Sequence, residues 1–374
     1  MGASLAVPTV DNLNATNPRS MRSSIEAVLG GSVVTGVDIA ALTAWMDTRA
    51  LGRGSLEDLA LLGGGTQNLL VKFRRDGTDY VLRRPPTHLR ANSSETMRRE
   101  ARMLAALAGT TVPHPRLIAA CADEAVLGAS FYLMEPVDGF NPSIGLPTLH
   151  AGSEAVRHRM GLAMVEAIAA LGALDYRTLG LADFGRPETY LERQVARWRA
   201  QLESYGEYEG WTGGCEIPGV DSVAAWLEAN RPVRFEPGII HGDYHLANVM
   251  FRFDGPELAA IVDWELTTIG DPLLDLGWLL ATWPEGDDPP PETTQVKPWR
   301  GFPTARELVA RYAACSHRDL SEINWYRVLA CYKLGIILEG THARACAGRA
   351  PRATGEMLHA QTVSLFQRAL RWMG

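Results

Sequence analysis

The chain has 374 residues, of which 46% are hydrophobic and 21% charged, and its formal net charge is -7. This length exceeds that of a typical single domain and the composition is that of an ordinary globular protein, so we expect two lobes around a substantial core. The negative charge argues against a nucleic-acid partner, which would favour a basic face.

The sequence gives no sign of a membrane span or a disulfide framework. No apolar run approaches the roughly 20 residues that a membrane span requires, and the N-terminus lacks the pattern of a signal peptide. The five cysteines are odd in number and form no CxxC pair, which favours reduced thiols and a cytoplasmic location. Residues 1–22 are rich in Ser, Asn, Thr, Ala and Pro without periodicity and predict a mobile tail.

The first lobe is predicted over residues 23–138. Apolar spacing over residues 37–48 predicts an entry helix. Residues 59–73 are typical of a strand, a glycine-rich turn and a second strand, and the turn holds Gly64, Gly65, Thr66 and Asn68. Glycines there would let backbone N–H groups close on a phosphate, although such a run is more often only a hairpin turn.

A third strand follows over residues 80–86 and a helix over residues 95–108. Strands at residues 119–120 and 130–137 complete a predicted five-stranded antiparallel sheet. The Gly- and Pro-rich residues from 139 to about 148 predict the connection to a second, mainly helical lobe over residues 139–374. The helices predicted in this lobe cover residues 155–173, 188–205, 222–229, 273–283, 304–315, 322–345 and 355–372.

The segment with the strongest chemical signal lies between these helices. Residues 249–251 and 258–262 are predicted strands, and the Asp-Gly-Pro turn at residues 254–256 joins them in a hairpin. This hairpin would place Asn248 beside Asp263, and an amide and a carboxylate oxygen together suit Mg²⁺. Asp243, on the preceding loop, could accept a proton from a substrate hydroxyl or orient it.

The segment HGDYHLAN at residues 241–248 resembles the catalytic loop of the aminoglycoside phosphotransferase and choline kinase-like family, cousins of the protein kinases. IVDWE at residues 261–265 resembles that family's metal-binding Asp segment. The resemblance implies that Asp243 is the catalytic Asp and that Asp275 anchors its loop through hydrogen bonds. It also implies that Asn248 and Asp263 bind Mg²⁺. We expect His241 to pack in the loop, and we assign His245 neither a packing nor a proton-transfer role.

The resemblance extends to the first lobe. It implies that Gly64, Gly65, Thr66 and Asn68 belong to the nucleotide loop, and that backbone groups of Glu135 and Val137 bind adenine with Met134 beside the ring. Arg83 stands where the family has a Lys for the α/β-phosphates, and Glu100 looks like its helix partner. A branch of the family fused to acyl-CoA dehydrogenases also uses Arg there, and residues 329–344 resemble that branch.

The fold that this resemblance implies is α+β and bilobal, protein kinase-like, with a five-stranded antiparallel sheet plus helix and a larger helical lobe. The implied reaction moves the γ-phosphoryl of ATP or GTP to a hydroxyl of a small molecule: an aminoglycoside-like compound, an aminoalcohol or a hydroxyacyl-CoA. Two alternatives stay open. One is a non-catalytic Mg-nucleotide-binding module, and the other is a metal hydrolase with His241, Asp243 and His245 as ligands.

Overall fold

A computed structural model describes residues 33–34, 36–63, 68–86, 92–284 and 295–374. The predicted tail over residues 1–22, the glycine-rich turn with Gly64, Gly65 and Thr66, and residues 285–294 lie outside this description. The described residues form two compact units, one within residues 33–108 and 115–137 and the other over residues 109–114 and 138–374. No helix in these ranges combines the length and apolarity that a membrane crossing requires.

The sheet unit contains the predicted five-stranded antiparallel sheet, with strands in the order β3-β4-β5-β7-β6. Its elements are β1 Val33–Val34, β2 Val37–Asp38, α2 Ile39–Thr48, β3 Glu57–Leu61, β4 Leu69–Arg75, β5 Thr78–Arg84, α3 Ser93–Leu107, β6 Leu117–Cys121, α4 Glu124–Leu127 and β7 Phe131–Met134. The β4-β5 hairpin turns at Asp76 and Gly77, both with positive φ, which matches the right-handed twist of paired strands.

Helix α2 covers the core of this unit. The Trp45 and Phe131 rings meet edge to face at 4.8 Å, and both side chains are buried. The strand predicted over residues 130–137 ends at Met134, because Pro136 has no N–H to continue the ladder.

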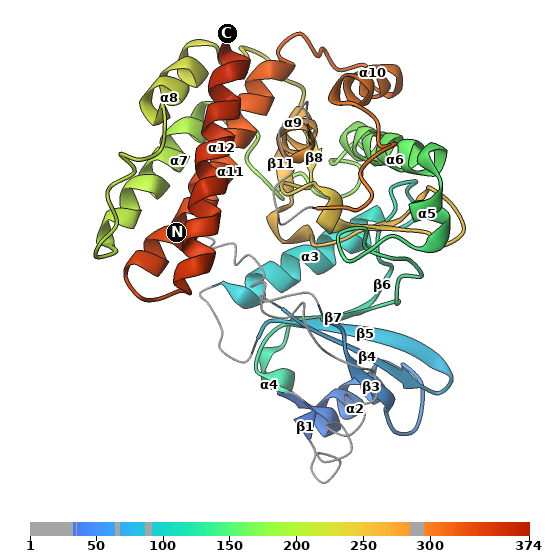
Figure 1. The fold of residues 1–374 in the computed structure, drawn as a ribbon. Coiled ribbons are helices and arrows are strands. Elements are labelled where there is room, and N and C mark those ends of the chain that lie inside the picture. The colour runs from blue at the N-terminus through green and yellow to red at the C-terminus, as the bar shows by residue number, and fades with distance from the viewer. Residues whose placement is uncertain (1–32, 35, 64–67, 87–91, 285–294) are drawn as a thin grey trace. The chain divides into compact units, whose positions relative to one another are not determined.

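The helical unit also carries two short sheets of two strands each, and the strands of one of them, β8 and β11, are labelled in Figure 1. Its elements are α5 Thr148–Gly152, α6 Glu154–Ala173, α7 Glu192–Ser204, η2 Tyr205–Glu207, α8 Val220–Ala229, β8 Gly238–Ile240, η3 Leu246–Asn248, β9 Val249–Phe251, β10 Leu258–Ile261, η4 Trp264–Leu266, β11 Thr268–Gly270, α9 Leu273–Thr282, α10 Ala305–Cys315, α11 Ile323–Cys346 and α12 Arg352–Met373. The predicted helices are all present, with ends shifted by at most four residues.

Helices α11 and α12 run side by side in this unit (Figure 1). They approach closely at Gly335, where an added Cβ would lie 2.7 Å from the Phe366 ring. The chain also pairs β8 with β11 in antiparallel fashion, with Ile240 opposite Thr268 and Gly238 opposite Gly270. This pairing fixes both ends of the segment that holds the predicted catalytic loop.

Candidate functional site

Strand β8 ends at Ile240, and the loop that follows is held by a buried carboxylate. Asp275, on α9, accepts hydrogen bonds from the backbone N–H groups of His241 at 2.7 Å and Gly242 at 2.8 Å. Burial raises the pKa of Asp275, while these two donors favour its charged form. The predicted anchoring of the loop by Asp275 is confirmed.

Gly242 is required by the shape of this loop. Its φ is 89°, in the left-handed region, and an added Cβ would lie 2.6 Å from the Leu266 carbonyl oxygen. Only a residue without a side chain fits such an approach.

Asp243 is largely buried and sits among polar partners. The Asn248 amide donates to its Oδ2 at 3.1 Å and to its carbonyl oxygen at 2.9 Å, and His245 Nε2 lies 3.3 Å from Oδ1. Burial alone would raise the pKa of Asp243, but His245, His241 and Lys333 outweigh burial and hold this pKa below its ordinary value. The carboxylate is therefore ionised and oriented, as an acceptor for a hydroxyl proton must be.

The two histidines of the loop differ in role. His241 is buried, its Nε2 lies 2.9 Å from the Val262 carbonyl oxygen, and its ring meets Trp264 edge to face at 5.0 Å, so the packing prediction is confirmed. The expectation that His245 does not pack in the loop needs correction, because its ring contacts both Asp243 and Asn248. The local fold of η3, which His245 caps, turns the ring toward Asp243.

Lys333, on α11, is a site residue that the sequence patterns did not single out. Its ammonium donates to the Gly242 carbonyl oxygen at 3.0 Å and lies 4.3 Å from the centroid of the Trp278 ring. Burial lowers the pKa of Lys333 to about 8, and the charge of Asp243 opposes that shift. A lone Lys inside an apolar helix pattern was the only signal in the sequence.

The predicted β9-β10 hairpin is present. Val249 pairs with Ile261, and the Val262 N–H donates to the Asn248 carbonyl oxygen at 2.9 Å. Asn248 and Asp263 therefore lie at the same end of the hairpin. Asp263 adopts a left-handed backbone conformation with φ 65°, a strained state that is common at functional sites.

These two side chains form a donor set that fits Mg²⁺. The Asn248 amide nitrogen is engaged by Asp243, which leaves the amide oxygen as the group that can face a cation. An amide oxygen and a carboxylate are hard ligands of the kind that Mg²⁺ takes, with its remaining positions given to water and phosphate. Their role as metal ligands remains a prediction.

In the sheet unit, the predicted pairing of Arg83 with Glu100 is confirmed. Arg83 Nε lies 2.8 Å from Glu100 Oε2, and Nη2 donates to Oε1 at 3.1 Å, a two-pronged contact between buried groups. The Tyr132 hydroxyl also donates to Oε2 at 2.8 Å. Three elements, β5, α3 and β7, thus fix the guanidinium, while its role toward phosphate remains a prediction.

The predicted adenine segment follows β7. Met134 ends the strand, and the Glu135 N–H donates to the Arg116 carbonyl oxygen at 2.9 Å. Because this N–H is already engaged, only the carbonyl group of Glu135 could bind adenine as predicted. Val137 lies beyond the end of the strand. Asn68 stands just before β4, at the end of the glycine-rich turn.

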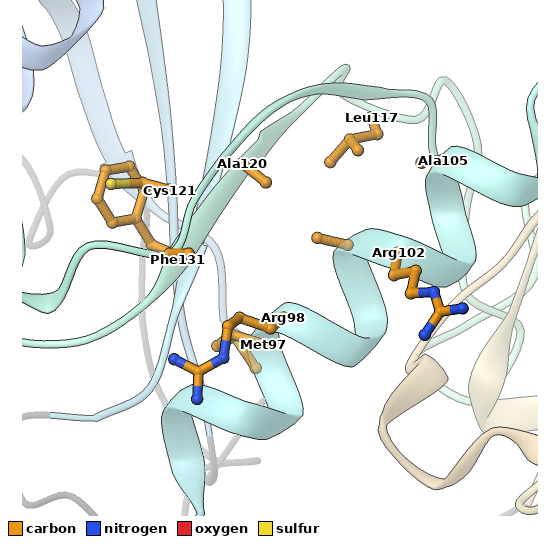
Figure 2. Close-up of a pocket in the computed structure, with 10 residues that line it drawn as sticks. Met97, Arg98, Arg102, Ala105, Leu117, Ala120, Cys121 and Phe131 are labelled. Carbon is orange, nitrogen blue, oxygen red and sulfur yellow. The ribbon is translucent and has the colours of Figure 1, made fainter. Parts of the chain in front are cut away.

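A pocket of about 310 Å³ opens in the sheet unit between α3 and β6 (Figure 2). It is apolar, with Met97, Leu117 and Phe131 in its walls and the arginines Arg98 and Arg102 on α3. Among the residues that the structure describes, no predicted nucleotide-binding residue lines it.

Comparisons with known proteins agree with this geometry. The family model described as "Phosphotransferase enzyme family" matches residues 58–308. A crystal structure from Ralstonia eutropha, provisionally named as an aminoglycoside phosphotransferase, is 31% identical and superposes with a TM-score of 0.72 over 90% of this chain and 99% of that one. A thermostable mutant of aminoglycoside phosphotransferase APH(4)-Ia, solved with AMP-PNP and hygromycin B, shares the fold at 16% identity and a TM-score of 0.56, over 87% of this chain and 98% of that one. The architecture is thus α+β and protein kinase-like.

A curated relative from the mouse, acyl-CoA dehydrogenase family member 10, is 27% identical over 99% of this chain. The human acyl-CoA dehydrogenase family member 11 is 29% identical over 83% of this chain. The chain spans 35% and 40% of the lengths of these two relatives.

Proposed function

This chain belongs to the phosphotransferase enzyme family, and on that premise we propose that it transfers the γ-phosphoryl group of ATP or GTP to a hydroxyl of a small molecule. The observation that carries the proposal is the state of Asp243. An ionised, nearly buried carboxylate, held by Asn248 and His245 on a loop that Asp275 anchors, is suited to align an acceptor hydroxyl and accept its proton.

The nucleotide side of the proposal rests on two further groups. Asn248 and Asp263 would hold Mg²⁺, which when bound supplies positive charge to the phosphates. Arg83, kept in place by Glu100 and Tyr132, would offer a fixed cation to the α/β-phosphates. In such transfers most of the rate comes from positioning and electrostatic stabilisation rather than from covalent chemistry by the protein.

The relatives bear on the acceptor. The curated relatives are named as acyl-CoA dehydrogenase family members, and residues 329–344 resemble the branch of the family that is fused to such enzymes. We therefore favour a hydroxyacyl-CoA compound as acceptor.

A non-catalytic Mg-nucleotide-binding module is the second candidate. The observation that favours it is Arg83, which replaces the family Lys and engages Glu100 with two of its nitrogens. A guanidinium is planar and larger than an ammonium, so it presents its remaining donors to a phosphate in a different geometry from the Lys of the family.

The five cysteines bear on location. All are free thiols, with Cys121 and Cys331 buried and the others exposed. Because free thiols persist in reducing compartments, we propose a cytoplasmic location.

The decisive experiment is a transfer assay with γ-labelled ATP, Mg²⁺ and a panel of one aminoglycoside, one aminoalcohol and one hydroxyacyl-CoA. We expect label on the hydroxyacyl-CoA in the wild type and none with Asp243→Asn. Asp254→Asn is the matched control, since Asp254 is an exposed hairpin-turn carboxylate paired with Arg252. Tight Mg-ATP binding without transfer to any acceptor would favour the non-catalytic module instead.

A further inference from the structure

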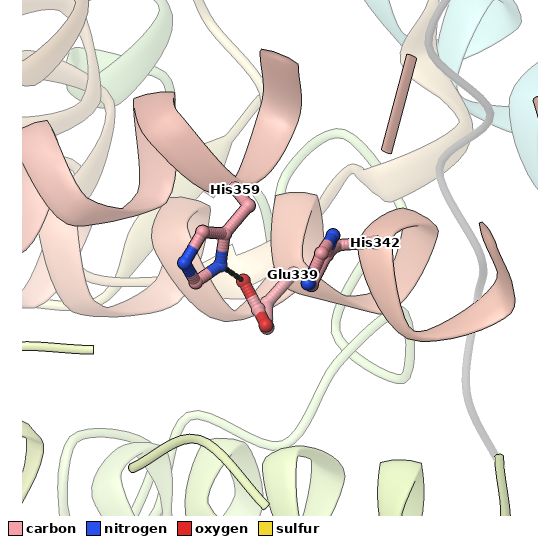
Figure 3. A group of neighbouring side chains, drawn as sticks. All are labelled: Glu339, His342 and His359. Carbon is pink, nitrogen blue, oxygen red and sulfur yellow. Dashed lines mark hydrogen bonds and ion pairs between the residues drawn. The ribbon is translucent and has the colours of Figure 1, made fainter. Parts of the chain in front are cut away.

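A second group of ligand-type side chains lies in the helical unit, on helices α11 and α12. Glu339 and His342 come from α11 and His359 from α12, and one potential ligand atom from each lies within 4.8 Å of the other two (Figure 3). Glu339 and His342 are three positions apart, which places both on one face of their helix. Nothing in the proposed phosphoryl transfer uses this group.

Glu339 and His359 are already in contact. The Glu339 carboxylate is buried, and its Oε2 lies 2.8 Å from His359 Nδ1 (Figure 3). Neighbouring ligands of a tetrahedral metal ion stand about 3.3 Å apart, since each lies about 2 Å from the ion. The pair therefore has nearly the spacing that a shared cation would need.

Both residues are also supported from behind. The Trp211 indole donates to the other carboxylate oxygen, Oε1, at 2.8 Å. The other ring nitrogen of His359, Nε2, faces the Glu216 carboxylate at 3.7 Å. A carboxylate behind the second nitrogen of a histidine, and a hydrogen bond that orients a ligating carboxylate, are the supports that metal ligands characteristically have.

His342 supplies the third nitrogen. Its Nδ1 is shielded from solvent and makes no hydrogen bond within the described residues, which is costly for a polar atom unless it serves a ligand. Its ring lies 4.5 Å from the His359 ring, and its Nε2 lies 3.6 Å from the Cys346 thiol. The ring is thus close to the other two ligands and has a nitrogen to offer.

We propose that Glu339, His342 and His359 form a binding site for Zn²⁺. Two imidazoles and one carboxylate are a known zinc ligand set, and the nitrogen donors disfavour Mg²⁺ and Ca²⁺. On binding, Zn²⁺ takes the place of the hydrogen between Glu339 Oε2 and His359 Nδ1, and the neutral His359 ring then carries its one N–H on Nε2, toward Glu216. A water molecule completes the coordination.

The site would stabilise the arrangement of the helices. It would tie α12 to α11, and through Trp211 and Glu216 it would tie in the segment between α7 and α8. Lys333 lies six residues earlier on α11, about 9 Å along the helix axis. The ion therefore lies apart from Asp243, and the failure of this proposal would leave the proposed kinase activity untouched.

The test uses the full chain, stripped of metal with a chelator and titrated with Zn²⁺ against a chromophoric zinc indicator in excess Mg²⁺. We expect one Zn²⁺ per chain and a higher Tm in its presence. His342→Gln should lower the affinity by more than about tenfold. His158→Gln, which removes an exposed histidine on α6, is the matched control and should leave the affinity unchanged.

Circular dichroism and the Tm of the metal-free variants establish that they fold. Anomalous diffraction at the zinc edge from wild-type crystals, which needs no variant, should place the ion between the three side chains. The absence of stoichiometric binding, an unchanged affinity in His342→Gln, or an ion located elsewhere would each overturn the proposal.

Discussion

The ammonium of Lys333 donates a 3.0 Å hydrogen bond to the carbonyl oxygen of Gly242, which is 91 positions away in the sequence. This bond joins the middle of α11 to the loop that carries Asp243. Asp275 accepts hydrogen bonds from the N–H groups of His241 and Gly242 in the same turn. The backbone of the loop is therefore bonded to a side chain through both its N–H and its carbonyl groups. Such double support keeps a reacting side chain in one geometry.

Lys333 should give the protein a characteristic dependence of stability on pH. Its pKa is about 8 in the folded chain and 10.5 ordinarily, so between these values the unfolded chain binds the extra proton. Stability rises with pH wherever the unfolded state binds more protons. We expect the free energy of unfolding of the wild type, measured in urea relative to Lys333→Met, to increase from pH 8 to pH 10. A constant difference would show that Lys333 titrates normally.

Substitution of Asp243 should separate chemistry from binding. Asp243→Asn keeps the shape of the side chain but removes its charge, so we expect transfer to fall by about 10²–10⁴. Nucleotide affinity should stay within several-fold, because Asp243 addresses the acceptor. Steady-state kinetics and a fluorescent-nucleotide titration measure the two effects. An equally large loss of nucleotide affinity would contradict this division of roles.

Asp263→Ala should act on the nucleotide instead. This substitution removes the proposed carboxylate ligand of Mg²⁺, so the affinity for Mg-ATP is expected to fall by more than about tenfold. The same titration without Mg²⁺ is the control, and there the variant and the wild type should bind alike. If the two proteins differ equally with and without Mg²⁺, Asp263 does not act through the metal.

Gly242→Ala should destabilise the protein for two reasons, its positive φ and the lack of space for a methyl group, so the loss should exceed that expected from φ alone. Gly348→Ala is the matched control, because Gly348 also has a positive φ of 69° but has open space where a Cβ would be. In Gly242→Ala the new methyl group would meet the Leu266 carbonyl oxygen, which adds about 1–3 kcal/mol. Urea denaturation of both variants tests the difference. An equal loss of unfolding free energy in the two variants would mean that the loop moves to accept the methyl group at no cost.

Arg83 should matter to stability as well as to phosphate binding. Arg83→Met leaves the Glu100 carboxylate buried without its cation, which costs about 3–5 kcal/mol. Arg83→Lys keeps the positive charge, so its free energy of unfolding should fall by less than half of that amount. Chemical denaturation gives both values. If Arg83→Met leaves the free energy of unfolding unchanged, the hydrogen bond from the Tyr132 hydroxyl is enough to compensate the buried Glu100 carboxylate.

Local patterns in the sequence specified much of this molecule. The Asp254-Gly255-Pro256 turn and the apolar runs on either side of it predicted the β9-β10 hairpin, because turn chemistry and side-chain pattern act over a few residues. The pairing of Arg83 with Glu100 came from the family resemblance rather than from such a pattern.

Contacts between distant segments were decided only by the tertiary structure. Nothing local in the sequence indicates that Lys333 reaches Gly242, that β8 pairs with β11, or that His359 meets Glu339. These meetings depend on which helix faces pack together, and helix packing follows the summed shape of many side chains rather than the identity of one. The sequence by itself determined the chemical groups of the site, and the packing of α9, α11 and α12 decided which other groups surround them.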